Sequence, residues 1–224
     1  MPEVFGTWAH AKSAPGRPRL RGYLHLAAFV TSLPAAYLLI GAAHDSTSRF
    51  AASVFSFGLT ALYGVSATYH RMTWLPDARR RMRGADHSMI FVLIACSYTA
   101  VALLVFTPAW QRVLLAIVWA GALTGVTLKI VAPVATRRVT GTMYIVLGWA
   151  AIIAAPQFIT RAPNTVIELI AAGGVLYTVG AIIFALKRPN PAPLVFGYHE
   201  IWHTMVVAAS VCHYAAIRML VTAR

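Results

Sequence analysis

Long apolar runs recur along the chain, and short polar segments separate them. A helix needs about 20 apolar residues to cross a hydrocarbon core that is about 30 Å thick. Seven runs reach this length, and they cover residues 23–43, 50–70, 86–106, 111–131, 139–159, 166–186 and 199–221. The pattern predicts an all-α membrane protein, folded as a seven-transmembrane helix bundle over residues 23–224, after a basic N-terminal segment of residues 1–22. Pro34 and Pro156 fall within or near the ends of runs, where a kink is tolerated in a membrane helix.

The composition also indicates a membrane protein. Of the 224 residues, 59% are hydrophobic and 11% are charged, and the mean hydropathy is +0.68. Charged residues make up about a quarter of an ordinary soluble domain, so no separate soluble domain is predicted. Cys96 and Cys212 fall inside apolar runs without C-x-x-C spacing, which argues against a disulfide framework or a redox pair. Residues 1–22 lack a short apolar core with a cleavage site, so the first span is interpreted as an uncleaved signal anchor.

The 19 Lys and Arg residues give a net charge of +13, and their positions predict how the chain lies in the membrane. They fall in short loops between apolar runs instead of forming a continuous face, so nucleic acid is not expected as a partner. Fourteen of them are on the side of the N-terminus: Lys12, Arg17, Arg19, Arg21, Arg71, Arg79, Arg80, Arg81, Arg83, Lys129, Arg137, Arg138, Lys187 and Arg188. The positive-inside rule therefore predicts a multi-pass protein of the cell inner (plasma) membrane, with a cytoplasmic N-terminus and an extracytoplasmic C-terminus.

The basic loops are expected to bind anionic lipids of the inner leaflet, because clusters of Lys and Arg next to a span are attracted to these lipids. The segment from Arg71 to Arg83 is predicted to lie on the surface of that leaflet. No feature of the sequence indicates an oligomeric state.

Two histidines, His199 and His203, open the seventh span. Residues four apart lie on one face of a helix, with Cβ atoms about 5–6 Å apart, so both imidazoles can bind one metal ion. The seventh span starts at the face where the second ends and the third begins, so His70 and Asp86 are predicted to lie at the same depth. Three neutral imidazoles with one open position are the ligand set of catalytic zinc. His70, His199 and His203 are therefore the predicted ligands of Zn²⁺.

Ser66 and Asp86 are the predicted catalytic residues. Ser66 lies four residues before His70 on the same helical face, where its hydroxyl can hold a water or donate to a developing oxyanion. Asp86 can orient a ligand, accept a proton from the attacking water or, less favoured, bind the ion itself. Each residue has an ordinary alternative as well. His70 can simply end its helix at the interface, Asp86 can be the N-cap of the third span, and Ser66 can bond to its own helix.

Three further histidines are expected to lie outside the site. His87 follows Asp86, but it points about 100° away along a helix. His25 in the first span and His213 in the seventh are expected to be hydrogen-bonded polar residues and not ligands.

The segment from His199 to His203 also spells H-E-x-x-H, the motif of zinc proteases in which the glutamate is the general base. Membrane-embedded proteases of the site-2 type take their third ligand from a downstream aspartate. All three aspartates of this chain are upstream, and no acid follows Glu200. An intramembrane metalloprotease is therefore the least favoured alternative.

Three ordered motifs together resemble those of the hemolysin III family. They are Ser66-x-x-x-His70, the run Asp86-His87-Ser88-Met89-Ile90-Phe91 leading to Ser97-Tyr98-Thr99, and His199-Glu200-Ile201-Trp202-His203 continuing to Ser210-x-x-His213. This family is the bacterial branch of the progestin and adipoQ receptors, which are adiponectin receptor-like proteins, and the pattern is also similar to that of the alkaline ceramidases. The resemblance covers nearly the whole chain from His25 onward. Ala100 departs from it, since a proline often follows the Ser-Tyr-Thr triplet.

The resemblance implies that His70, His199 and His203 bind zinc near the cytoplasmic side, and that Ser66 and Asp86 support a water. It implies a metal-dependent hydrolase that acts on a lipid amide or ester, with a membrane lipid as substrate and a role in membrane homeostasis. The family name implies cell lysis, which does not suit a chain without a soluble form. The alternative hypothesis is a zinc-stabilised receptor-like or sensor protein without turnover, in which the metal ties the second, third and seventh spans together.

Overall fold

The computed structural model of the chain describes residues 18–132 and 135–223, and in this part of the chain there is no β-strand. Residues 1–17 of the predicted N-terminal segment lie outside the described residues. The helices are α1 (Tyr23–Gly41), α2 (Ser46–Arg71), α3 (Pro76–Val105), α4 (Pro108–Val131), α5 (Arg137–Gly148), the 3₁₀ helix η2 (Ala150–Ala154), α6 (Ala155–Arg161), α7 (Asn164–Leu186) and α8 (Tyr198–Thr222). Seven helical segments of the described chain are long and apolar enough to cross a membrane, the fifth of which runs from α5 through η2 into α6. The predicted seven-helix membrane bundle is confirmed.

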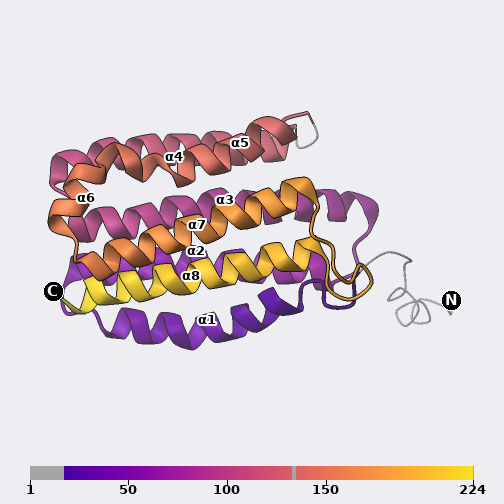
Figure 1. Ribbon diagram of the computed structural model, residues 1–224, viewed down its shortest axis with the longest axis horizontal. Helices are drawn as coiled ribbons and strands as arrows, with labels where there is room; N and C mark the ends of the chain where they lie inside the picture. Colours follow the sequence, from indigo (N-terminus) through magenta and orange to yellow (C-terminus); the bar gives the residue numbers. More distant parts are fainter. Residues whose placement is uncertain (1–17, 133–134, 224) are drawn as a thin grey trace, which may run out of the picture.

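The helices lie side by side along the longest axis of the molecule (Figure 1), with α1 at one edge and α4 and α5 at the other. The last helix, α8, packs against α7 and also contacts α1, α2 and α3. Gly180 of α7 permits part of this packing, since a Cβ atom at this position would lie 2.8 Å from the side chains of Trp202 and Met205. The central place of α8 brings its side chains together with those of three helices from the first half of the chain.

Local sequence sets where several helices begin. The carboxylate of Asp45 accepts hydrogen bonds from the backbone N–H groups of Thr47 (2.8 Å) and Ser48 (3.0 Å), which caps α2. Pro76 and Pro108 occupy the first positions of α3 and α4. Proline suits this position because its fixed φ is already helical and its missing N–H would have had no partner there.

Helix α3 is longer than the hydropathy predicts, and this changes the interpretation of Asp86. It begins at Pro76, and its 30 residues are about 45 Å long at 1.5 Å per residue, against about 30 Å for the hydrocarbon core. Asp86 therefore lies within the helix, and the alternative that it caps the third span is wrong. The basic residues from Arg79 to Arg83 form the first turns of α3, and the position of the stretch from Arg71 to Arg83 on the inner leaflet stays a prediction.

The fifth span contains a break just before Pro156. Proline has no N–H, and its ring clashes with the carbonyl group four residues earlier, here that of Ile152. The Ile152 carbonyl instead accepts a hydrogen bond from the backbone N–H of Ala155, and the preceding turn narrows to the 3₁₀ helix η2. Pro34, in contrast, lies inside the continuous helix α1.

Tyr98 of α3 bonds to both sides of this break. Its hydroxyl donates to the carbonyl of Gly148 (2.9 Å) and accepts from the backbone N–H of Ala151 (2.7 Å). The neighbouring Thr99 accepts a hydrogen bond from the indole N–H of Trp119 (3.0 Å). Two residues of the Ser-Tyr-Thr triplet thus connect α3 to α4 and to the fifth span, which indicates a structural role.

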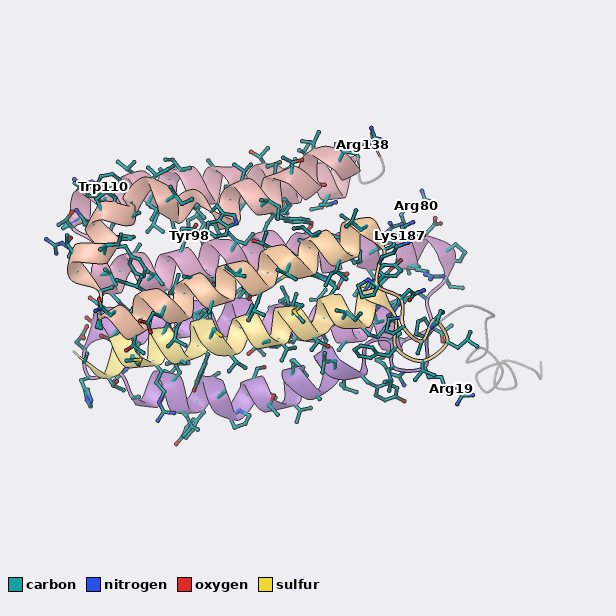
Figure 2. All side chains as sticks on the ribbon, in the orientation of Figure 1. Arg19, Arg80, Tyr98, Trp110, Arg138 and Lys187 are labelled. Carbon is teal, nitrogen blue, oxygen red and sulfur yellow. The ribbon has the colours of Figure 1, made fainter. Side chains whose placement is uncertain are left out.

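Described basic residues that the sequence assigns to one side gather at one end of the bundle, whereas Lys12 and Arg17 lie outside the described residues. Figure 2 shows Arg19, Arg80, Arg138 and Lys187 at the end where the described chain begins, with Trp110 at the opposite end. The C-terminus lies at that opposite end (Figure 1), as an odd number of spans requires. The assignment of the basic end to the cytoplasm stays a prediction.

Candidate metal centre

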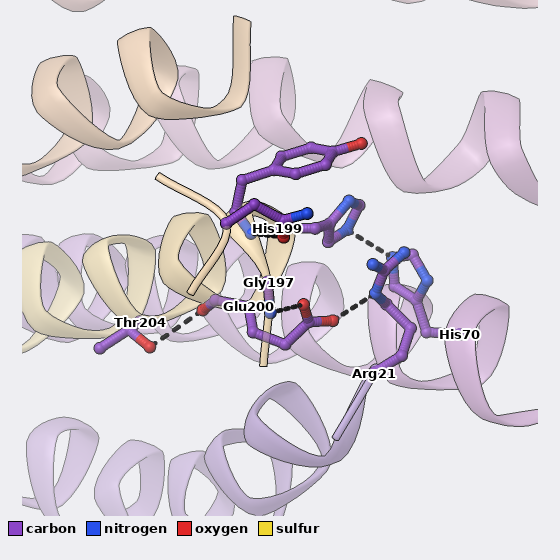
Figure 3. A network of polar contacts seen from close by, with 8 residues as sticks. Arg21, His70, Gly197, His199, Glu200 and Thr204 are labelled. Atoms are coloured by element: carbon purple, nitrogen blue, oxygen red, sulfur yellow. Dashed lines mark hydrogen bonds and ion pairs between the residues drawn. The ribbon is translucent and has the colours of Figure 1, made fainter. Parts of the chain in front are cut away.

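The end of α2 and the start of α8 bring three histidines together, and Figure 3 shows two of them, His70 and His199, facing each other. His70 lies in the last turn of α2, and His199 and His203 lie in the first two turns of α8. One ligand atom from each ring lies within 4.8 Å of the other two. The ring centroids of His70 are 4.8 Å from His199 and 5.2 Å from His203. The predicted meeting of these three rings is confirmed, and the group can hold a metal ion.

The spacing of the ring nitrogens suits a tetrahedral ion. The Nε2 atoms of His70 and His199 are 3.2 Å apart. Two ligands of a zinc ion with bonds of about 2.0–2.1 Å lie about 3.3–3.4 Å apart in a tetrahedral site. His70 and His203 are buried, and His199 is half-buried. The donor chemistry of all three residues therefore suits a metal ion, and the pair of His70 and His199 already has the separation of two bound ligands.

Asp86 lies beside this cluster and keeps a small exposure. Its carboxylate interacts electrostatically with His70 and His199 and forms a hydrogen bond with the side chain of Ser66. The Asp86 side chain is 13% exposed. Among the described residues, the group of close ligand atoms consists of the three histidines and does not include Asp86. The two predicted catalytic residues thus contact each other next to the cluster.

His87 lies closer to the site than its helical position predicts. Its Nδ1 atom is 3.4 Å from Oδ2 of Asp86 and 2.9 Å from the carbonyl oxygen of Arg83. A carbonyl oxygen only accepts, so Nδ1 carries the proton in that bond. The expectation that His87 points away from the site is therefore wrong, since the ring folds back to contact the carboxylate.

His25 of α1 is the residue that sequence reasoning missed. Its ring stacks on that of His203, with centroids 3.7 Å apart and planes at 3°. Neither ring nitrogen has a hydrogen-bond partner among the described residues, so the prediction of a hydrogen-bonded polar residue is wrong. His25 is two residues inside α1, at the same end as His70, so the reasoning on depth that found His70 contained the signal.

Glu200 has a structural role in the centre. Its carboxylate forms a buried ion pair with Arg21 and accepts a hydrogen bond from the backbone N–H of Gly197 (2.8 Å), which caps α8 (Figure 3). Residues one apart on a helix point about 100° away from each other, so Glu200 faces away from His199. The carboxylate of Glu200, which a protease mechanism needs as general base, is thus bound to Arg21 and to the backbone of Gly197. This argues against the protease alternative.

The Arg21–Glu200 pair yields a testable prediction. The Glu200 side chain is 4% exposed, so Arg21→Ala would leave a buried charge without its partner. Such a loss costs about 3–5 kcal/mol of unfolding free energy. The double variant Arg21→Ala/Glu200→Gln should recover most of this cost, because it removes the charge and keeps an oxygen to cap α8. The unfolding free energies of the wild type, of Arg21→Ala and of the double variant can be measured in detergent, with circular dichroism as the signal of unfolding.

Arg19→Ala is the matched control, because Arg19 is exposed and two residues away. It should unfold like the wild type. If Glu200→Gln leaves the fold intact but abolishes metal-dependent hydrolysis, Glu200 takes part in the reaction and its assignment as a purely structural residue fails.

An apolar cavity of about 150 Å³ approaches the cluster from inside the bundle. Its walls come from α2, α3, α7, α8 and the broken fifth span. Leu62, Ile90 and Val206 line it, and they lie one helical turn from Ser66, Asp86 and His203, respectively. None of the cluster residues lines the cavity, which thus begins about one helical turn further into the bundle.

The final motif, Ser210-x-x-His213, forms a separate polar cluster deeper in the bundle. The hydroxyls of Tyr177 and Ser210 are 2.8 Å apart, and the rings of Tyr177 and His213 pack edge to face. One ring nitrogen of His213 bonds to the backbone of Ile170, whereas Nε2 has no partner among the described residues. His213 is thus partly hydrogen-bonded, and it lies outside the three-histidine group as expected.

Comparison with known proteins agrees with the motifs. The model of a family described as "Haemolysin-III related" matches residues 14–214. The chain is 32% identical over 184 residues to "Hemolysin-3" of Bacillus cereus, which covers 81% of each protein. It is also 32% identical over 185 residues to the "Hemolysin-3 homolog" of Bacillus subtilis (strain 168), covering 80% of this chain and 82% of that one. The "Monocyte to macrophage differentiation factor" of Homo sapiens is 25% identical over 201 residues, covering 87% of this chain and 80% of the human protein.

Proposed function

The chain belongs to the haemolysin-III-related family of multi-pass membrane proteins, and we propose on this premise that it is a zinc-dependent hydrolase of a membrane lipid. The bond it cleaves is an amide or an ester. The observation that carries the proposal is the group of three imidazoles, with one carboxylate beside it and an apolar cavity that begins about one helical turn further into the bundle. A purely structural polar cluster would need neither the carboxylate nor the cavity.

Zinc is the metal that the ligand set favours. His70, His199 and His203 would hold it, and three imidazoles leave one position of a tetrahedral ion open. When bound, the ion supplies a Lewis acid that polarises a carbonyl group and activates a water. The stacking of His25 on His203 would keep one ligand ring in its orientation.

Asp86 would move the proton in the reaction. Its carboxylate accepts a proton from the attacking water, the water oxygen adds to the lipid carbonyl carbon, and the same proton passes to the leaving amine or alcohol as the bond to it breaks. The small exposure of Asp86 suits this role, because the group can be reached without being fully solvated. Ser66 contacts Asp86 and would orient the carboxylate or donate to the oxyanion.

The cavity would hold the lipid chain. Its wall is almost entirely apolar, with side chains such as Leu93, Ile94 and Val101, and its volume of about 150 Å³ compares with about 10–15 Å³ for a single water by the same measure. A scissile bond placed at the cluster would leave the acyl chain inside the bundle. A lipid amide or ester has this arrangement, with a polar bond at the head of an apolar chain.

A receptor-like or sensor protein without turnover is the second candidate. It is favoured by the way the cluster joins α2 to α8, since a bound ion would tie together two segments that are far apart in the sequence. Hydrolysis is preferred because Asp86 stands beside the cluster and is not one of the close ligand atoms.

The membrane context is also part of the proposal. The protein would lie in the cell inner membrane with the cluster near the cytoplasmic face, where its basic end attracts anionic lipids. A lipid substrate would reach the cavity from within the bilayer.

Turnover in the presence and absence of metal tests the proposal. The purified full-length protein is assayed in lipid nanodiscs with N-acyl and O-acyl lipids, then after treatment with a zinc chelator, and again after zinc is restored. We expect fatty-acid release that is lost with the metal and returns with it. If the protein binds zinc and is stabilised by it, but releases no fatty acid from any of these lipids, the result would support the sensor hypothesis instead.

A further inference from the structure

A second hollow runs along the outside of the bundle between α1 and α2. This groove has a volume of about 860 Å³, and it shares no lining residue with the internal cavity. Leu26, Leu33 and Ile40 form its α1 wall, and the α2 wall extends from Ser53 to Met72. The 19 residues from Ser53 to Arg71 have a rise of about 27 Å between the first and the last at 1.5 Å per residue, close to the thickness of a hydrocarbon core. The groove therefore faces the bilayer over nearly its whole depth.

Arg71, the last residue of α2, lines the groove at the end of that helix. Its guanidinium group lies 3.7 Å from the ring centroid of Tyr23 and donates a hydrogen bond to the Tyr23 hydroxyl (2.8 Å). In the part of the chain that the structure describes, no carboxylate forms an ion pair with Arg71. Tyr23 thus holds the guanidinium in place without neutralising its charge.

The chemistry of this end matches a phosphate at the head of an acyl chain. A guanidinium binds phosphate through parallel hydrogen bonds, and the basic first turns of α3 add positive charge at the same end. Met72 and Met82 close the apolar part of the groove beside Arg71. We infer that the groove binds one phospholipid from the leaflet next to the histidine cluster, with its phosphate on Arg71 and an acyl chain along α1 and α2.

The position of Arg71 connects this lipid to the fold of the metal centre. Gly22, at the start of α1, has a positive φ of 82°, and a Cβ atom there would lie 2.6 Å from Cβ of His70 and 3.3 Å from the side chain of Arg71. The start of α1 therefore packs on both residues. A phosphate that fixes Arg71 would hold together the start of α1 and the end of α2, which carries His70.

Native mass spectrometry of the full-length protein tests the site. The protein is released from detergent micelles during titration with dioleoyl phosphatidylglycerol, with dioleoylglycerol as the phosphate-free analogue and inorganic phosphate as the lipid-free one. We expect one retained phosphatidylglycerol per chain and little retention of either analogue. Arg71→Ala should weaken phosphatidylglycerol binding about tenfold or more, because a charge-assisted bond is lost. Arg49→Ala, at the opposite end of α2, is the matched control and should bind like the wild type.

A second variant tests the acyl part of the groove. Ala61 lines the groove, and Ala61→Trp should fill it and weaken phosphatidylglycerol binding while Arg71 stays in place. If the Arg71→Ala protein does not fold, Ala61→Trp still provides a test of the lipid site. Equal retention of dioleoylglycerol and phosphatidylglycerol, or undiminished binding by Arg71→Ala, would overturn the proposal. Tight binding of inorganic phosphate together with normal lipid binding by Ala61→Trp would also overturn it, in favour of a simple anion site.

Discussion

Replacement of His203 by alanine is expected to remove the metal from the purified protein. The three ligand atoms lie within 4.8 Å of one another, so the remaining pair of imidazoles leaves two sides of a tetrahedral ion open. The loss of a mere outer-sphere partner of a metal costs about 10–100-fold in affinity. Loss of His203, as a proposed ligand, should lower the metal affinity at least about a hundredfold. Elemental analysis and chelator competition can measure this change.

His213→Ala is the matched control, because His213 lies on the same helix and outside the three-histidine group. It should keep about one zinc per chain. Metal that binds the folded state in hundredfold excess over its Kd stabilises it by about 2.7 kcal/mol. A chelator should therefore lower the melting temperature of the wild type and of His213→Ala, but not that of His203→Ala. If His203→Ala still carries stoichiometric zinc, the three-histidine site is wrong.

The three-histidine cluster could be predicted because depth in a membrane bundle follows from the order of the spans. Each apolar run crosses the bilayer once, so the end of the second run and the start of the seventh must reach the same face. That reasoning brought His70 to His199 and His203 across 129 residues of sequence. The spacing of four residues within α8 then supplied the common helical face.

The partners of these histidines depend on packing, which hydropathy does not describe. His25 lies at the right depth, but its stacking on His203 follows from the direction in which α1 faces α8. The Arg21–Glu200 pair joins the segment before α1 to the first turn of α8 for the same reason. Both contacts arise because α8 occupies the middle of the bundle, and the order of the spans alone does not predict which helix lies there.

Helix boundaries were predicted less well than helix positions. Hydropathy marks where the chain enters the hydrocarbon core, whereas Pro76 starts α3 ten residues before Asp86, outside that core. The break in the fifth span follows from Pro156. The backbone groups on both sides of the break are hydrogen-bonded by Tyr98, which lies in another helix. A tertiary contact of this kind has no signal within the segment that it stabilises.

Asp86→Asn is expected to stop hydrolysis while the metal stays bound. Asparagine has nearly the same shape and can still accept the hydrogen bond from Ser66, so the packing around the cluster should persist. It does not take up the proton of the attacking water. A positioned general base contributes about 10²–10⁴-fold to a rate, so kcat should fall by that factor with zinc content unchanged.

Asp77→Asn is the matched control, because Asp77 lies on the same helix with a side chain that is 84% exposed. Its turnover and zinc content should equal those of the wild type. A fall in turnover for Asp86→Asn alone, with one zinc per chain in all three proteins, separates the proton-transfer role from a role in metal binding. If Asp86→Asn loses its zinc, Asp86 is a ligand and the open position assigned to water is filled. If it keeps both zinc and full turnover, the proton must pass through another group, and the hydrolytic mechanism built on this carboxylate fails.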